Sequence, residues 1–129
     1  MSSEKLKYQI KSNLQEMKEI VTEMTNVSDM VGGSFGIIYR KCGKTNCWCN
    51  KENQKGHPLM RITFVENKKF RAISIPQKDK EWIKKMNDNY KKFRQNFQKL
   101  RQYQNKLNEL LNQFEKDAKL KTSQLRDYL

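Results

Sequence analysis

All three cysteines and the only histidine of this 129-residue chain lie within one stretch of sixteen residues. Their spacing is CX4CXC–X7–H, and the residues concerned are Cys42, Cys47, Cys49 and His57. With 36% hydrophobic and 32% charged residues, the chain cannot build a large apolar core. Small modules of this kind usually fold with the help of a metal, a disulfide or a partner chain. The cluster therefore constrains the fold more than any other feature.

Three thiols and one imidazole are a ligand set that Zn²⁺ takes in closed, tetrahedral structural sites. An odd number of cysteines and the lack of an apolar secretory signal favour a reducing cytoplasm, where clustered cysteines are metal ligands more often than disulfides. We therefore expect a structural zinc site. The alternatives are buried free cysteines, a redox pair of thiols, and an ordinary turn histidine at His57. Glu52 is the only carboxylate within the cluster, so we expect neither catalytic zinc nor enzymatic activity.

The spacing of the cluster sets two local conditions. Gly43, directly after Cys42, would let backbone amides turn toward the thiolate, as in a zinc knuckle. Cys47 and Cys49 would lie about 6.5 Å apart in an extended strand, so both can bind one metal only if Trp48 lies at a turn.

The apolar periodicity predicts an α+β chain, in which a small zinc-bound, three-stranded antiparallel β module separates an N-terminal helix from a long C-terminal coiled-coil helix. A turn is expected at 66–69, with Asn67 at positive φ. The expected elements are a helix over 3–26, strands over 34–40, 59–65 and 70–75, and a helix from about 78 to about 119. The corresponding domains are 1–27, 28–77 and 78–129, and the last ten residues are expected to fray or to dock elsewhere.

The long helix carries an apolar seam whose steps alternate between three and four residues. The first helix is too short to cover all of this seam, so we expect a homodimer through the long helix. Gln104 would either fix the register by pairing with its symmetry mate or mark a loosely packed layer. The expected oligomer seam consists of Phe97, Leu100, Gln104, Leu107, Leu111 and Phe114.

The net charge of +13 is confined to the middle of the chain. Residues 28–77 carry a net +6 and residues 78–106 a net +7, whereas both ends are neutral. A general bias toward lysine should spread along the chain, so this localisation favours contact with nucleic acid, which we expect to be duplex DNA. Trp48 could stack on a base, or it could cap the module core. The candidate nucleic-acid-binding residues are Arg40, Lys41, Lys44, Trp48, Lys51, Lys55, Arg61, Lys68, Lys69, Arg71, Lys84, Lys85, Lys91, Lys92 and Arg94.

The run from Tyr39 to Cys49, followed by Gly56-His57-Pro58, resembles the core of a family of short, uncharacterised microbial proteins. Those proteins pair a CGKxxCxC…HGP motif with a long C-terminal helix, and they often occur beside transposases or in mobile elements. In this chain the glycine precedes the histidine instead of following it. The resemblance implies a zinc-binding module and a mobile-element context.

Two hypotheses follow for the function. The first is a zinc-stabilised, dimeric DNA-binding accessory protein of a mobile element, which assists a transposase or recombinase. The second is a protein–protein adaptor, in which the coiled coil docks on a larger enzyme and the zinc module is only structural. Neither hypothesis involves a membrane, because no apolar run approaches the length of a membrane span.

Overall fold

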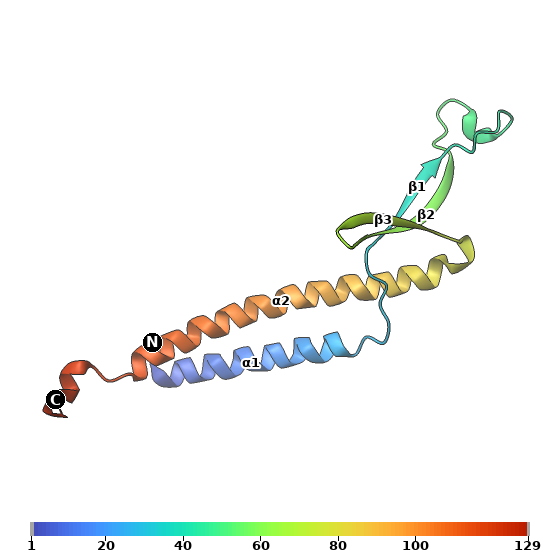
Figure 1. Ribbon diagram of the computed structural model, residues 1–129. Helices are drawn as coiled ribbons and strands as arrows, with labels where there is room; N and C mark the ends of the chain where they lie inside the picture. Colours follow the sequence, from blue (N-terminus) through green and yellow to red (C-terminus); the bar gives the residue numbers. More distant parts are fainter. Residues whose placement is uncertain (1, 129) are drawn as a thin grey trace. The chain divides into compact units, whose positions relative to one another are not determined.

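The computed structural model describes residues 2–128 and confirms the expected α+β fold (Figure 1). The main elements are α1 (Ser3–Thr25), β1 (Ser34–Arg40), β2 (His57–Glu66), β3 (Lys69–Ile75) and α2 (Lys80–Ala118). Short 3-10 turns occupy Trp48–Asn50, Gln77–Asp79 and Thr122–Tyr128. The chain packs as two units: one joins α1 to the part of α2 from Phe93 onward, and the other is Ser28–Lys92. No helix within residues 2–128 has both the length and the apolar character needed to cross a bilayer.

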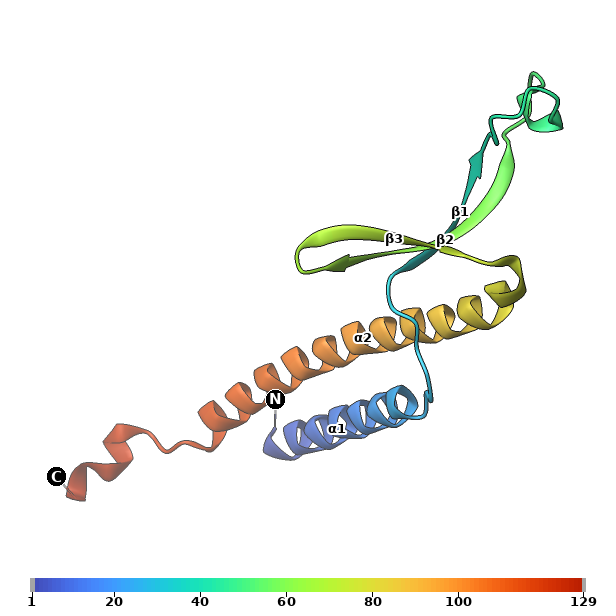
Figure 2. The same cartoon turned by 45° about the vertical axis from the view of Figure 1, so that its right-hand side comes forward.

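The first unit is an antiparallel helix pair (Figures 1 and 2). Ser2 caps α1, because its side chain accepts a hydrogen bond from the Lys5 backbone N–H at 3.2 Å. Leu6 of α1 and Leu110 of α2 are buried. Two turns away along each helix, the buried Asn13 side chain of α1 donates to the Tyr103 carbonyl of α2 at 2.9 Å. A satisfied buried amide of this kind favours one register of the pair over its neighbours.

The packed face of α2 includes only part of the expected seam. Phe97, Leu100, Leu107 and Phe114 are half-buried, whereas Gln104 and Leu111 are exposed. The other packed positions fall one residue earlier than expected, which turns the centre of the covered stripe by about 50° around the helix, half of the roughly 100° step per residue. These positions are Asn96, Tyr103 and Leu110.

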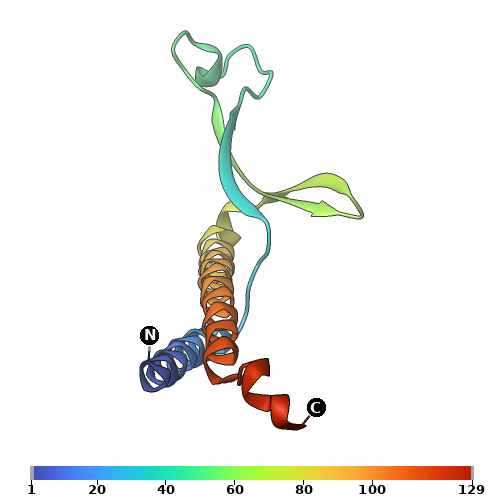
Figure 3. The same cartoon turned by 90° about the vertical axis from the view of Figure 1, so that its left-hand side faces the viewer.

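The second unit is built on a sheet of order β1-β2-β3, with both pairs antiparallel. Strand β1 pairs with residues 57–63 of β2, and β3 pairs with residues 60–66, so the three strands overlap only at 60–63. Beyond this overlap the sheet continues as two-stranded ribbons. We call residues 38–59 the cysteine arm and residues 64–71 the hairpin arm; Figures 1 and 3 show them pointing in different directions.

The turn of the hairpin arm has the expected chemistry. Asn67 and Lys68 both have positive φ, 51° and 64°, as the two central residues of a type I′ turn require. The turn therefore fixes the β2–β3 register that the pairing of Glu66 with Lys69 shows.

The core of the second unit is small and depends on a buried amide. Met60 and Ile62 of β2 and Ile83 of α2 are its buried apolar side chains. Asn87, fully buried on α2, donates to the carbonyls of Val31 and Gly33 at 2.9 and 2.8 Å. These two bonds hold the segment that leads into β1 against the first part of α2.

We predict that Asn87→Ala lowers the free energy of unfolding by about 2–3 kcal/mol, because two carbonyls lose their donor and a cavity remains. Urea denaturation followed by circular dichroism measures this loss. Asn89→Ala is the matched control, since Asn89 donates to the Asp29 carbonyl at 3.2 Å in an exposed position and has only a long contact, at 4.0 Å, to the Met86 sulfur besides. Equal losses in both variants would contradict the assigned role of Asn87.

Candidate metal centre

The strand pairing at the base of the cysteine arm brings the two ends of the ligand loop together. Arg40, the last residue of β1, lies opposite His57, the first residue of β2. Cys42 follows Arg40 by two residues, so the first and last ligands of the cluster are neighbours although fourteen residues separate them in the sequence. The structure begins β2 at His57 and not at residue 59, which places the imidazole on the sheet itself.

A 3-10 turn places Cys47 and Cys49 on the same side of the loop. The turn spans Trp48–Asn50, and the Asn50 backbone N–H donates to the Cys47 carbonyl at 3.2 Å. The Cys47 backbone N–H donates to the Lys44 carbonyl at 3.2 Å, and the Asn50 side chain donates to the same carbonyl. Trp48 thus lies at the turn that a shared metal requires of a CXC spacing.

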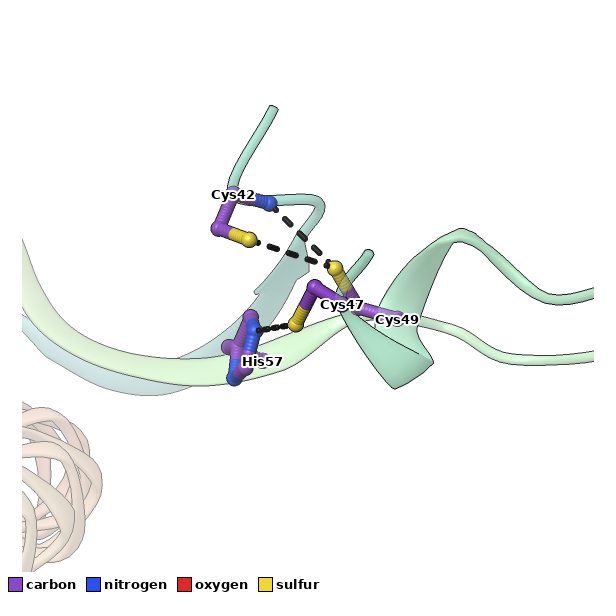
Figure 4. A group of neighbouring side chains, drawn as sticks. All are labelled: Cys42, Cys47, Cys49 and His57. Carbon is purple, nitrogen blue, oxygen red and sulfur yellow. Dashed lines mark hydrogen bonds between the residues drawn. The ribbon is translucent and has the colours of Figure 1, made fainter. Parts of the chain in front are cut away.

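The four candidate ligand atoms lie within 4.8 Å of one another (Figure 4). The sulfurs of Cys42 and Cys49 are 3.6 Å apart, and the Cys47 sulfur is 3.1 Å from His57 Nε2. Ligands bonded to zinc at about 2.0–2.3 Å occupy the corners of a tetrahedron with edges of about 3.3–3.8 Å. The donor set and its spacing therefore suit a metal ion, with Cys49 buried at the inner side and Cys42 at the exposed side.

The loop shifts the pKa values of the Cys42 and Cys47 thiols in opposite directions. The backbone N–H of Lys44, assisted by the Cys47 thiol, lowers the pKa of Cys42 to about 6. Gly43 makes this contact available through its positive φ of 82°. The backbone N–H of Cys49 favours the Cys47 thiolate, but burial and the neighbouring Cys42 and Cys49 sulfurs outweigh it, so the pKa of Cys47 is raised. Binding of a metal would therefore release the proton of Cys47.

Trp48 contacts the candidate ligand set directly. Its ring meets the His57 imidazole edge to face, with centroids 4.8 Å apart and planes at 63°. Nearly half of the Trp48 side chain, 47%, remains exposed. One side of the indole thus orients the imidazole, and the other side is open.

Gly56 has a role at this site that the sequence reasoning missed. Its φ is +104°, and an added Cβ would lie 2.7 Å from the Arg40 carbonyl carbon. The sequence signal was present, since an isolated glycine before a strand often marks a close backbone approach. Here the approach is between the two strands that bring Cys42 beside His57.

The basic candidates are distributed over the second unit and do not share one face. The cysteine arm carries five of them, the hairpin arm three and the first part of α2 four, while Arg61 lies where the three strands overlap and Arg94 belongs to the helix pair. Arg40 and Arg61 lie on one face of the sheet, and Lys69 and Arg71 on the other, as the strand register shows. An open hollow of about 390 Å³ lies beside Cys42 and His57 and is bordered by Arg40 and Lys41.

We predict that each of Cys42→Ser, Cys47→Ser, Cys49→Ser and His57→Ala loses most of its bound metal, because each removes one of four donors. Metal content of the purified protein, measured by elemental mass spectrometry, tests this. Asn46→Ser, an exposed position between two ligands, is the control and should retain a full complement. Full metal content in any ligand variant would remove that residue from the site.

We also predict that Gly56→Ala weakens metal binding more than either of two other glycine variants. The positive φ alone costs a side chain on the order of 1–3 kcal/mol, and the overlap with Arg40 adds to it. Gly43→Ala should be intermediate, since Gly43 has a positive φ but open space around it. Gly36→Ala should be neutral, because nothing lies within 4 Å of its added Cβ. Competition with a chromogenic chelator measures the three affinities, and any other order would contradict this account.

Comparisons with known proteins place the chain in a family. A family model described as a domain of unknown function, DUF6788, matches residues 4–85, which include nearly all of α1, the whole sheet and all four candidate ligands. No curated protein matches the chain, and no solved structure does. Because the matched residues make up more than half of its length, the chain belongs to the DUF6788 family.

Proposed function

We propose that the chain is a zinc-stabilised protein that binds duplex DNA and acts as an accessory factor of a transposase or recombinase. The observation that carries this proposal is the position of the charge. The whole net charge of +13 falls within residues 28–106, around the Cys/His cluster, whereas residues 1–27 and 107–129 are neutral. Basic side chains concentrated on one part of a protein provide the phosphate contacts that dominate affinity for DNA.

Zinc is the metal that fits the donor set best. Thiolates and imidazole select zinc over magnesium or calcium, which prefer oxygen ligands. Four protein ligands leave no open position for a substrate or an activated water, so the ion would be structural. It would cross-link the cysteine arm, which contains five of the basic candidates, and the reducing cytoplasm would keep the thiols available.

The DNA-facing surface would include both arms and the exposed lysines of α2. Lys84, Lys85, Lys91 and Lys92 are all exposed, and the two pairs repeat at an interval of seven residues along the helix. The hollow bordered by Arg40 and Lys41 adds cations beside the cluster. The proposed mobile-element context depends on the resemblance of the CGKxxCxC…H motif to proteins encoded beside transposases.

A second copy of the chain would cover the exposed side of the helix pair. Leu14, Val21 and Leu111 are 42–47% exposed, and each directly follows a residue of the packed seam. In an antiparallel pair such positions on both helices lie on the same side, where Gln104 also lies. Two of these sides facing each other would form a four-helix bundle with Gln104 beside its symmetry mate.

The same apolar side supports the adaptor as the alternative function. If a larger enzyme covers Leu14, Val21 and Leu111, the zinc module would be needed only for folding. The two functions differ in what the lysines of α2 do.

We predict that the protein binds random-sequence duplex DNA with an affinity that falls with salt, by about 0.9 logarithmic units per neutralised phosphate. Reversal of Lys84, Lys85, Lys91 and Lys92 to glutamate should weaken binding at least tenfold and reduce the salt slope by up to about 3–4. Fluorescence anisotropy over a salt series measures both quantities.

A matched control reverses the four basic residues of the neutral C-terminal part, which are Lys116, Lys119, Lys121 and Arg126. It has the same net charge as the test variant, yet it should bind nearly as well as the parent. Absence of binding even at low salt would exclude the DNA-binding function and favour the adaptor. Equal losses in both variants would show that only net charge matters.

A further inference from the structure

The hairpin arm exposes two apolar side chains that the fold does not use. Val65 is 67% exposed and Phe70 is 74% exposed. The strand register places them directly opposite each other, on the same face of the ribbon. Strand β1 stops pairing at Thr63, so no third strand lies beside them. They form one apolar patch next to the turn.

This patch lies on the opposite face from the core of the second unit. Successive side chains of a strand point to opposite faces of the sheet. The buried residues Met60 and Ile62 are an odd number of positions from Val65 along β2, so they face the other way. Phe70 therefore lies outside that core, and its partner across the ribbon is Val65. An exposed apolar patch rimmed by polar residues usually marks a contact with another molecule.

The surroundings of the patch indicate what that molecule is. Lys68 lies in the turn, and Lys69 and Arg71 project from the other face of the same ribbon. Glu66 is the only acidic residue of the arm, and its carboxylate lies 3.8 Å from the Arg71 guanidinium. The arm therefore combines an apolar pair on one face with a net positive charge in the turn and on the other face, and this combination suits a polyanion that also offers apolar surface. Stacked base pairs between two phosphate backbones meet both conditions.

We propose that the hairpin arm enters the minor groove of duplex DNA and that Val65 and Phe70 insert as a wedge at a base step. This inference depends on the proposed DNA-binding function and assigns the element that deforms the duplex. Apolar wedges on DNA-bending proteins unstack one step and kink the helix, while neighbouring cations contact the backbones. Trp48, the residue first considered for stacking, already has one side of its ring against His57.

The test uses the full-length zinc-loaded protein and an end-labelled duplex of about 25 base pairs. This duplex is much shorter than the persistence length of DNA, about 150 base pairs, so it stays nearly straight unless it is kinked. One version is fully paired, and the other has a single central mismatch. The parent protein should bring the labels closer and prefer the mismatched duplex, because its central step is already weakened. The Phe70→Thr variant should neither bring the two end labels closer nor prefer the mismatched duplex, and it should bind on the order of tenfold more weakly.

Two controls separate the wedge from the phosphate contacts. Ile73→Thr changes a 52% exposed residue of the same strand on the opposite face, and it should behave as the parent does. The double variant Lys68→Gln with Lys69→Gln should lower the salt slope by about 2 and keep the mismatch preference. Phe70→Thr should leave the slope unchanged, since it removes no charge. Circular dichroism and zinc content verify that each variant is folded.

The outcomes distinguish this inference from the function on which it depends. If the parent protein binds no duplex, the DNA-binding function is itself excluded. If the parent binds and Phe70→Thr retains the label approach and the mismatch preference, the wedge is excluded and DNA binding stands. Preference for an RNA duplex, binding to lipid vesicles that Phe70→Thr loses, or a change of oligomeric state in Phe70→Thr would each assign the patch to another partner and overturn the proposal.

Discussion

The pairing of Arg40 with His57 is the contact on which the second unit depends most. It closes the loop that contains the cysteines, places the imidazole beside Cys42, and requires a glycine at position 56 because the two strands approach closely there. Without this pairing, three thiols and an imidazole would be separate side chains on a flexible loop. With it, a metal ion would bind a site that is largely formed, and the free energy of binding would stabilise the sheet that forms the site.

The rest of the fold has little apolar material with which to replace that contribution. Among the residues that the structure describes, the buried hydrophobic side chains are few and divided between two units. Each unit adds a buried asparagine that bonds to backbone carbonyls: Asn13 in the helix pair and Asn87 beneath the sheet. The N–H groups of such amides contribute modest net stability, but they penalise every alternative arrangement that leaves those N–H groups without an acceptor. Polar contacts therefore help this chain to select one native arrangement, whereas a larger protein would rely on the packing of its apolar core.

The short overlap of the three strands explains how a small protein could offer several contact surfaces. A sheet whose outer strands overlap for only four residues of β2 leaves two ribbons free, and each ribbon ends in a basic segment. The metal would stabilise one arm, and a type I′ turn shapes the other. A helix pair with one covered seam and one apolar side is suited to assembly. The proposed DNA binding would use both arms, with the wedge on the hairpin arm, and the proposed dimer would use the helix pair.

Local pattern in the sequence was enough to predict the elements, the antiparallel sheet, the hairpin turn and the identity of the candidate ligands. Each depends on short-range rules: apolar periodicity, turn chemistry, and the clustering of soft donors. The tertiary structure decided which stripe of α2 is covered, so that Tyr103 and Leu110 pack where Gln104 and Leu111 were expected. It also decided that Gly56 lies against the Arg40 backbone and that Phe70 is exposed. These features depend on which segments lie side by side, and neither helical nor strand periodicity encodes the neighbour that a residue meets.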